Sequence, residues 1–133
     1  MENSAEFRKY AGADLDAVLN LCAREGWTSY TVDRARSHQV FEAPGVVSVV
    51  ATVGDSVVGF AYCQTDRALQ AYLSLLVVDK WHRQVGIARA LVAHVFPLLG
   101  ATRRDLITDS AGAFYRALSH KEQLGFRRYP ESE

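Results

Sequence analysis

The chain has 133 residues, of which 49% are hydrophobic, and it carries 15 basic and 15 acidic side chains. This length fits one domain with a buried core, and the hydrophobic content excludes an intrinsically disordered chain and a small disulfide-stapled protein. The balanced charge argues against a nucleic-acid-binding protein that depends on a general positive field.

Strand and helix patterns alternate along the chain. Apolar residues recur at helical spacing in some segments, and short apolar runs mark strands in others. In chain order, the predicted elements are a strand at 7–10, helices at 15–22 and 32–41, strands at 46–53, 57–64 and 69–78, a helix at 87–98, a strand at 106–108, a helix at 112–118 and a strand at 126–129. Asp14 and Thr31 are the predicted N-caps of the first two helices. This order predicts a single α/β (α+β) domain over 1–133, with a mixed, mostly antiparallel sheet flanked by helices.

Cysteine spacing and the N-terminal sequence favour a cytoplasmic protein. Cys22 and Cys63 lie in apolar contexts without CxxC spacing, and the four histidines lack the spacing of a metal site. The N-terminus lacks the basic-then-apolar order of a signal peptide, and no apolar run approaches the ~20 residues that span a bilayer. We therefore expect no metal, no membrane association and no nucleic-acid partner.

The segment from Leu76 to Arg89 carries the clearest chemical signal. A buried strand ends there and a helix begins, and the first turn of a helix leaves backbone amides that bind anions. Gly86 and Ala88 keep side chains away from those amides, and Arg83 and Arg89 add positive charge. Neither GxxxxGK[ST] nor GxGxxG is present, so a P-loop or Rossmann site is not expected. The pattern predicts a turn that binds a diphosphate.

Arg83-x-x-Gly86-x-Ala88, directly after Val-Val-Asp, resembles the [QR]-x-x-G-x-[GA] signature of the GNAT superfamily of acyl-CoA-dependent N-acetyltransferases. The order of elements is similar over nearly the whole chain, and Phe114-Tyr115 followed by 124–126 (LGF) resembles the family's FY…LGF ending. The resemblance implies a GNAT-like fold and acetyl-CoA as co-substrate. It also implies direct transfer of the acetyl group to a primary amine, with no covalent enzyme intermediate. Homodimers are common in this family.

The resemblance also implies roles for individual residues. Tyr115 would protonate the departing CoA thiolate, which suits a phenol that stays protonated at neutral pH. Asp109 stands where the family often has an asparagine that contacts CoA, so that contact is lost or shifts to Ser110. The strand before the signature would pair with the pantetheine arm and the turn would hold the pyrophosphate. These implied cofactor-binding residues are Leu76, Val77, Val78, Arg83, Gln84, Val85, Gly86, Ile87, Ala88 and Arg89.

The acceptor side is predicted from aromatic residues. Two of them lie in the turn between the first two helices, which flanks the acceptor in the family. Two others alternate in phase with Gln64 and Ser74 on neighbouring strands, so we expect them to face one cleft. The predicted acceptor-binding residues are Trp27, Tyr30, Tyr62 and Tyr72. A mostly apolar pocket with a few polar groups suits a small-molecule amine better than a protein.

The base that deprotonates the amine does not follow from the sequence. Tyr72 stands where relatives that act on protein lysines often carry a glutamate. Glu42, His38, Asp66 or a chain of waters are the alternatives.

Three further questions stay open at this stage. The segment 119–123 lengthens the usual link between FY and LGF, and it either borders the acceptor or is a solvated insertion. Trp81 either packs over the turn or lies near the adenine of CoA. The alternative to an enzyme is a non-catalytic GNAT-fold domain that binds acyl-CoA as a sensor or serves as an interaction module.

Overall fold

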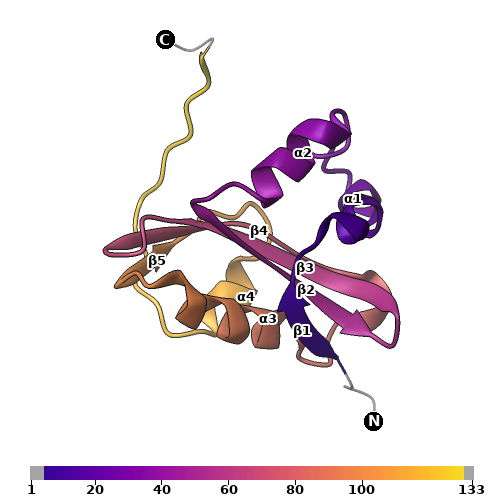
Figure 1. Cartoon of the computed structure of the whole chain (residues 1–133). Helices are drawn as coiled ribbons and strands as arrows, with labels where there is room; N and C mark the ends of the chain where they lie inside the picture. Colours follow the sequence, from indigo (N-terminus) through magenta and orange to yellow (C-terminus); the bar gives the residue numbers. More distant parts are fainter. Residues whose placement is uncertain (1–4, 131–133) are drawn as a thin grey trace.

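The computed structural model describes residues 5–130, and its centre is one five-stranded sheet (Figure 1). In sheet order the strands are β1 (Glu6–Lys9), β2 (Val46–Val53), β3 (Ser56–Thr65), β4 (Gln70–Val78) and β5 (Arg103–Asp105). Strands β1 to β4 pair antiparallel, whereas β5 pairs parallel to β4. The predicted mixed, mostly antiparallel sheet is confirmed.

Helices cover both faces of this sheet (Figure 1). On one face lie α1 (Leu15–Arg24) and α2 (Arg34–Phe41), and on the other lie α3 (Ile87–Val95) and α4 (Gly112–Arg116). Three short 3-10 helices complete the fold: η1 (Gly12–Asp14), η2 (Lys80–His82) and η3 (Phe96–Leu99). Within residues 5–130, no helix is long and apolar enough to cross a membrane.

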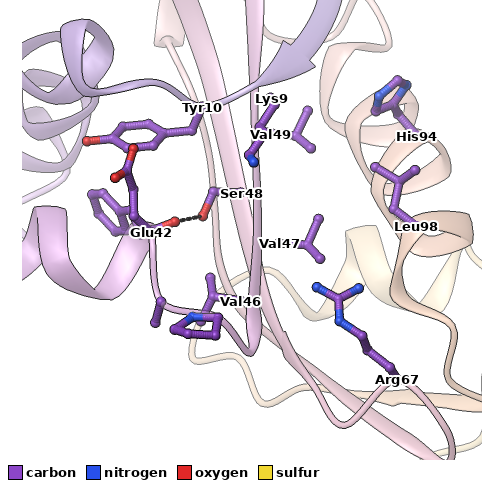
Figure 2. Close-up of a pocket in the computed structure, with 13 residues that line it drawn as sticks. Lys9, Tyr10, Glu42, Val46, Val47, Ser48, Val49, Arg67, His94 and Leu98 are labelled. Carbon is purple, nitrogen blue, oxygen red and sulfur yellow. Dashed lines mark hydrogen bonds between the residues drawn. The ribbon is translucent and has the colours of Figure 1, made fainter.

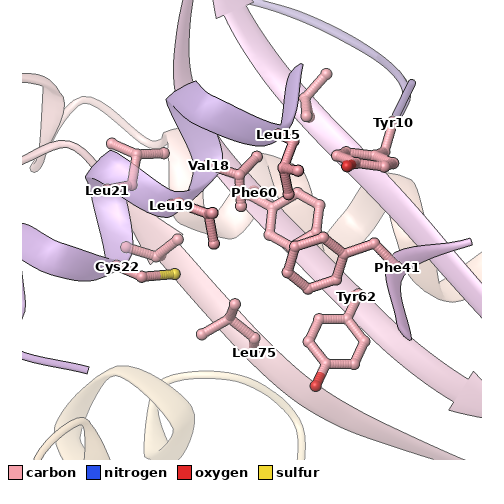
Figure 3. Close-up of a cluster of buried hydrophobic side chains, with 12 residues drawn as sticks. Tyr10, Leu15, Val18, Leu19, Leu21, Cys22, Phe41, Phe60, Tyr62 and Leu75 are labelled. Carbon is pink, nitrogen blue, oxygen red and sulfur yellow. The ribbon is translucent and has the colours of Figure 1, made fainter. Parts of the chain in front are cut away.

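The core between the sheet and helices α1 and α2 is rich in aromatic rings (Figure 3). The ring centroids of Phe41 and Phe60 are 4.8 Å apart, and Tyr10 packs edge-on against Phe41 at 5.4 Å. Val18 and Cys22 of α1 are fully buried beneath them. These two positions belong to the apolar stripe that predicted the helix, so its burial against the sheet explains the pattern.

Helix α3 is held tightly against the opposite face of the sheet. Its residues Leu91 and Val95 are fully buried, as is Leu99 in η3. A Cβ on Gly59 of β3 would lie only 3.1 Å from the Leu91 side chain, so a glycine there allows the helix to approach the strand closely. This packing fixes the position of the N-terminus of α3.

Strand β4 contains a β-bulge at Ser74. Tyr62 on β3 pairs with Leu75, but the next residue, Cys63, pairs with Leu73, so Ser74 is the extra residue. As a result Leu73 joins the core under α3, whereas Leu75 joins the core under α1 and α2. From the bulge onward, the side chains of β4 therefore lie on the opposite face of the sheet from the one that strict alternation would give them.

One predicted helix start needs correction. Helix α2 begins at Arg34, two residues after the predicted start at Val32. Its N-cap is Asp33, whose carboxylate accepts the amide of Arg36 at 3.1 Å, and Thr31 lies outside the helix.

Asp14 precedes α1 but makes no capping bond to that helix. Its carboxylate instead pairs with the Arg8 guanidinium at 2.8 Å and accepts the Ala11 amide at 2.9 Å. The Asp14 carboxylate therefore bonds to a charged residue of β1 instead of to the first amides of α1.

Two predicted strands near the C-terminus, at 106–108 and 126–129, are wrong for the described chain. The strand here is β5, three residues earlier than expected, and residues 119–130 form an irregular segment that we call the C-terminal tail. The tail passes the β5 edge and ends on the side of α1 and α2 (Figure 1). Its side chains Leu124 and Phe126 are 90% and 86% exposed. A short segment of this kind forms no strand without a neighbour to supply ladder hydrogen bonds.

Candidate functional site

The candidate site begins where β4 separates from β5. Strand β5 pairs only with Gln70–Tyr72, the first three residues of β4. From Leu73 onward, within the described chain, β4 has β3 on one side and no strand on the other. The Val78 carbonyl is bonded to Arg83 Nε at 3.0 Å, and the other backbone groups of Leu76, Val77 and Val78 that point away from β3 are left for another partner.

The turn after β4 has an unusual backbone at two residues. Gln84 and Gly86 have positive φ values of 65° and 89°, and Gly86 is the N-cap of α3. The first intrahelical bond runs from the Ala90 amide to the Gly86 carbonyl at 2.9 Å, so the amides of 87–89 precede it and have no partner within the helix. Together with the helix dipole, these amides form a surface that attracts an anion.

Asp79 organises this turn from inside. Its carboxylate, on a residue only 8% exposed, accepts the Trp81 amide at 3.1 Å, lies 2.9 Å from His82 Nδ1 and pairs with Arg24 at 2.8 Å. Burial opposes its ionisation, but the hydrogen bonds from His82 and the Trp81 amide and the charge of Arg24 hold its pKa below the usual value. Because Arg24 neutralises this carboxylate, no uncompensated negative charge from Asp79 lies beside the anion-binding amides.

Arg83 is bonded within the protein. Its Nε donates to the Val78 carbonyl at 3.0 Å, and its guanidinium pairs with Glu25. The consecutive residues Arg24 and Glu25, at the end of α1, thus pair with Asp79 and Arg83 respectively; we call these the crossed ion pairs. Arg83 therefore shapes the turn, whereas Arg89 is exposed on α3.

Tyr115 lies on α4 and packs against the core under α3. Its ring meets Phe114 edge-on at 4.9 Å. Burial, with a smaller effect from Cys63, raises the pKa of Tyr115 to about 12. The hydroxyl therefore stays protonated at neutral pH and is able to donate a proton. Asp109 and Ser110 are exposed in the turn that precedes α4.

On the opposite face of the sheet, five polar side chains gather around the bulge of β4. The hydroxyls of Tyr30 and Tyr62 are 3.1 Å apart. Gln64 Nε2 donates to Ser74 Oγ at 3.0 Å, and Gln64 pairs in register with Tyr72. We call these five residues the phenol cluster. The structure thus brings together Tyr30 and the four residues that the sequence places in phase.

The buried tyrosines of the phenol cluster cannot act as bases at neutral pH. Burial raises the pKa of Tyr30, and it raises that of Tyr62 further with help from the Tyr30 hydrogen bond. The Ser37 hydroxyl donates to the Tyr30 carbonyl at 2.6 Å and fixes the loop that carries Tyr30. Trp27, in the same loop, is 38% exposed.

A pocket of about 400 Å³ adjoins the cluster at the start of β4, and Gln64, Asp66, Gln70 and Tyr72 contribute to its wall. Asp66 accepts backbone amides of 68–70, and these bonds lower its pKa. A carboxylate in this state is a weak base. The pocket therefore offers space beside the cluster but no basic carboxylate at Asp66.

His38 and Glu42 lie away from the β4 edge. Tyr10 Oη is 2.9 Å from His38 Nδ1, and His38 Nε2 is 3.6 Å from Glu42. Tyr10 and Glu42 point toward each other in a second pocket, of about 480 Å³, at the uncovered end of β2 (Figure 2). Strand β2 is two positions from β4 in the sheet, or roughly 10 Å. Of the predicted alternatives for deprotonation, a chain of waters is the one that this geometry leaves.

Two other open questions receive a structural answer. Glu122 pairs with Arg116 of α4 at 3.0 Å and lies 3.7 Å from His120, so the segment 119–123 folds back on α4 rather than over the phenol cluster. Trp81 is 81% exposed, with the Lys80 ammonium 5.1 Å from its ring centre. Its indole therefore does not pack over the turn. Within residues 5–130, no group of three or more His, Cys, Asp and Glu side chains could hold a metal ion.

Sequence reasoning missed two features of this site. The crossed ion pairs join residues at least 55 positions apart, and no local spacing indicates them. The bulge has a weak signal, a serine at position 74 that interrupts the apolar part of the strand.

The comparison with protein families agrees with this geometry. The model of the Acetyltransferase (GNAT) family matches residues 13–119. The chain belongs to the GNAT acetyltransferase family. Acetyl-CoA is the co-substrate in this family, and the open β4 edge and the amides of α3 fit its two polar parts, the pantetheine arm and the diphosphate.

Solved structures share the fold at low identity. An aminoglycoside acetyltransferase from an uncultured soil metagenomic sample is 21% identical with a TM-score of 0.77, covering 96% of this chain and 98% of that chain. A transcriptional regulator from Bacillus halodurans C-125 is 19% identical with a TM-score of 0.80, covering 94% and 99%. AAC(6')-Iy, in complex with a bisubstrate analogue of CoA and acetylneamine, is 17% identical with a TM-score of 0.75, covering 96% and 99%. No curated protein sequence matches this GNAT chain significantly.

Proposed function

We propose that this GNAT protein is an N-acetyltransferase that moves the acetyl group of acetyl-CoA directly to a primary amine of a small molecule. The observation that supports it is the junction of β4 and α3. There an open strand edge leads into a helix N-terminus capped by Gly86 at positive φ. An open edge binds an amide-containing arm through backbone hydrogen bonds, and helix amides bind a diphosphate.

In this proposal Leu76, Val77 and Val78 pair with the pantetheine arm. The backbone of 84–89 binds the diphosphate, with Arg89 and Ser110 as outer contacts and Arg83 holding the turn in shape. The amine attacks the thioester carbonyl carbon, the C–S bond breaks, and the sulfur receives the proton of Tyr115. The amine loses its proton to water, since the buried phenols of the cluster hold theirs.

A small-molecule acceptor is supported by the walls of the phenol cluster. The cluster supplies aromatic rings and a few hydrogen-bonding groups, and its members Gln64 and Tyr72 line a pocket of about 400 Å³. Such a lining suits a small ligand better than an extended peptide. Two of the similar structures are aminoglycoside acetyltransferases, which is consistent with this class of acceptor. A cytoplasmic location and a homodimer stay predictions.

A non-catalytic acyl-CoA sensor is the second candidate. Its support is the lack, within the described phenol cluster, of a carboxylate or histidine to act as base. One similar structure is named a transcriptional regulator, which is consistent with a sensor.

Thermal unfolding in the presence of acetyl-CoA, CoA or adenosine diphosphate separates these proposals from a fold without cofactor binding. At a hundred times the dissociation constant, acetyl-CoA adds about 2.7 kcal/mol of stability, which raises Tm by several degrees. We expect a larger rise with acetyl-CoA than with the diphosphate, and release of CoA thiol with an amine panel. A rise in Tm without thiol release with any amine favours the sensor. No rise with any of the three overturns both proposals.

Gly86→Ala and Gly54→Ala make a matched pair for this test. Both glycines have positive φ, and a Cβ on either would meet no atom within 4 Å. Each substitution costs about 1 kcal/mol of stability through backbone strain. Only Gly86→Ala should also reduce the rise in Tm with acetyl-CoA, because Gly54 lies in the turn between β2 and β3. An equal reduction of the rise in Tm in both variants would show that the turn at Gly86 is not part of the cofactor site.

A further inference from the structure

The pocket of about 480 Å³ at the uncovered end of β2, which we call the edge pocket, lies apart from the proposed cofactor and acceptor sites (Figure 2). Strand β1 pairs with β2 only as far as Lys9, opposite Val49. The Tyr10 amide then donates to the Ser48 carbonyl at 2.9 Å, and the chain turns away into η1. Within the described chain, no strand lies on this side of residues 46–48, and the space left there has the volume of a small-molecule site.

The half of the edge pocket that faces α3 is mostly apolar. Val47 and Val49 point from β2 toward His94 and Leu98 (Figure 2). The His94 ring stacks on Phe7 with their centroids 5.5 Å apart, which fixes one end of this wall. Leu98, beside it, is 48% exposed. An apolar chain that lay along this wall would remove its surface from water.

Two cations line the same pocket. Lys9 and Arg67 are exposed, and no carboxylate among residues 5–130 forms an ion pair with either of them. Glu42 is the carboxylate in the lining, and it lies 3.6 Å from His38 Nε2. Burial, followed by the charge of Glu42, raises the pKa of Tyr10 to about 12, so this phenol is uncharged. With neutral histidines, two cations and one carboxylate leave one positive charge, which a monoanion would balance.

Arg67 is held at the edge pocket by an unusual backbone. In the described chain, the non-glycine residues at positive φ are Gln84, in the proposed diphosphate turn, and Arg67, with a φ of 63°. The Thr65 hydroxyl accepts the Arg67 amide at 2.9 Å and donates to the Leu99 carbonyl at 2.7 Å. A Cβ on Gly100 would lie 3.3 Å from the Arg67 carbonyl oxygen, so this turn packs closely on the end of η3. Backbone strain of this kind persists where its surroundings fix it, and it is common at binding sites. The guanidinium points from this fixed turn toward β2 (Figure 2).

We propose that the edge pocket is a second ligand site, which binds a small organic acid with one carboxylate and an apolar chain. The carboxylate lies at the Arg67 guanidinium, which binds such a group through two parallel hydrogen bonds, and Lys9 adds its charge. The chain lies along the apolar wall that faces α3. This inference goes beyond the proposed acetyltransferase function and does not rest on it, because the lining includes none of the residues proposed to bind the cofactor or the acceptor.

An NMR titration of the ¹⁵N-labelled full chain tests this proposal. The probes are octanoate, butyrate, which has four fewer CH₂ groups, and octylammonium, which has the same chain with the opposite charge. We expect octanoate to shift the amide signals of Val47, Ser48, Arg67 and Leu98 in a saturable way. Since each buried CH₂ group is worth up to about fourfold in affinity, octanoate should bind at least about tenfold more tightly than butyrate. Octylammonium should bind at least about tenfold more weakly than octanoate.

Variants of the two halves of the pocket show which groups bind the probe. Arg67→Asn removes the guanidinium and keeps a residue that accepts the left-handed backbone, and it should weaken octanoate binding about tenfold. Leu98→Gln should reduce the advantage of octanoate over butyrate. Arg36→Gln is the matched control, because it removes the same charge from the exposed face of α2, outside the lining, and it should leave the affinity unchanged.

Four results would overturn the inference: no saturable shift with octanoate, shifts confined to residues outside the edge pocket, equal affinity for octylammonium, or unchanged affinity in Arg67→Asn. Shifts of the pocket amides with protein concentration alone would show that a second copy of the chain covers this edge, and they would overturn it too. None of these measurements needs acetyl-CoA or turnover, so failure of the acetyltransferase proposal is seen separately, in the Tm and thiol-release experiments.

Discussion

Tyr115 is the residue whose chemistry depends most directly on burial. Packing against the core under α3 raises its pKa to about 12, so the hydroxyl carries its proton throughout the physiological range. If it protonates the departing thiolate, Tyr115→Phe should lower kcat about 100-fold while leaving the affinity for acetyl-CoA unchanged. The wild-type rate should also show no alkaline decline from this group below about pH 10, since a general acid remains active until pH approaches its pKa.

Steady-state kinetics from pH 6 to pH 10 checks this prediction. Tyr129→Phe is the matched control, because it removes a phenolic hydroxyl from the tail, on a residue 57% exposed, and it should leave kcat unchanged. Unaltered kcat in Tyr115→Phe would make Tyr115 a packing residue.

At the scale of secondary-structure elements, the crossed ion pairs connect α1 to the turn that precedes α3. Asp79→Asn removes the charge that Arg24 pairs with, although the amide oxygen still accepts the Trp81 amide. Because the pKa of Asp79 is lowered in the folded protein, its ionic contribution is present above the unfolded pKa of ~3.9 and is lost as pH falls through the folded value. We therefore expect Asp79→Asn to be about 2 kcal/mol less stable at pH 7, with a smaller difference below pH 4.

Urea unfolding at pH 7 and pH 3 measures that difference. Asp55→Asn, in the exposed turn between β2 and β3, should match the wild type at pH 7. If Asp79→Asn lowers the free energy of unfolding equally at both pH values, the loss comes from the changed packing and hydrogen bonding of the side chain and not from its charge.

The elements that the sequence predicted well are those whose signal is local. The apolar stripe of α1 depends on neighbouring residues, and the helix is found where expected. The bulge at Ser74 depends on how β4 pairs with β3, which periodicity does not contain. The predicted strand at 126–129 shows the converse: its aromatic residues favour a strand, but no strand lies beside it in the described chain.

The same distinction applies to the candidate site. Gly86 and Tyr115 belong to short motifs, so they could be named from the sequence alone. The ion pair of Arg24 and Asp79 joins distant segments through the fold. Pairs of this kind become visible only when the sheet order is known.

At the scale of the whole molecule, stability comes from the two cores on either face of the sheet and not from the tail. Leu91 is fully buried between α3 and the sheet, whereas Phe126 is 86% exposed. Leu91→Ala should therefore cost about 3 kcal/mol of unfolding free energy, and Phe126→Ser less than about 0.5 kcal/mol. Urea unfolding at two protein concentrations measures both changes. A loss above about 1 kcal/mol in Phe126→Ser, together with a stability that rises with protein concentration, would mean that a second copy covers the tail. The expected homodimer would then bury Leu124 and Phe126, and the stability of the chain would depend on its concentration.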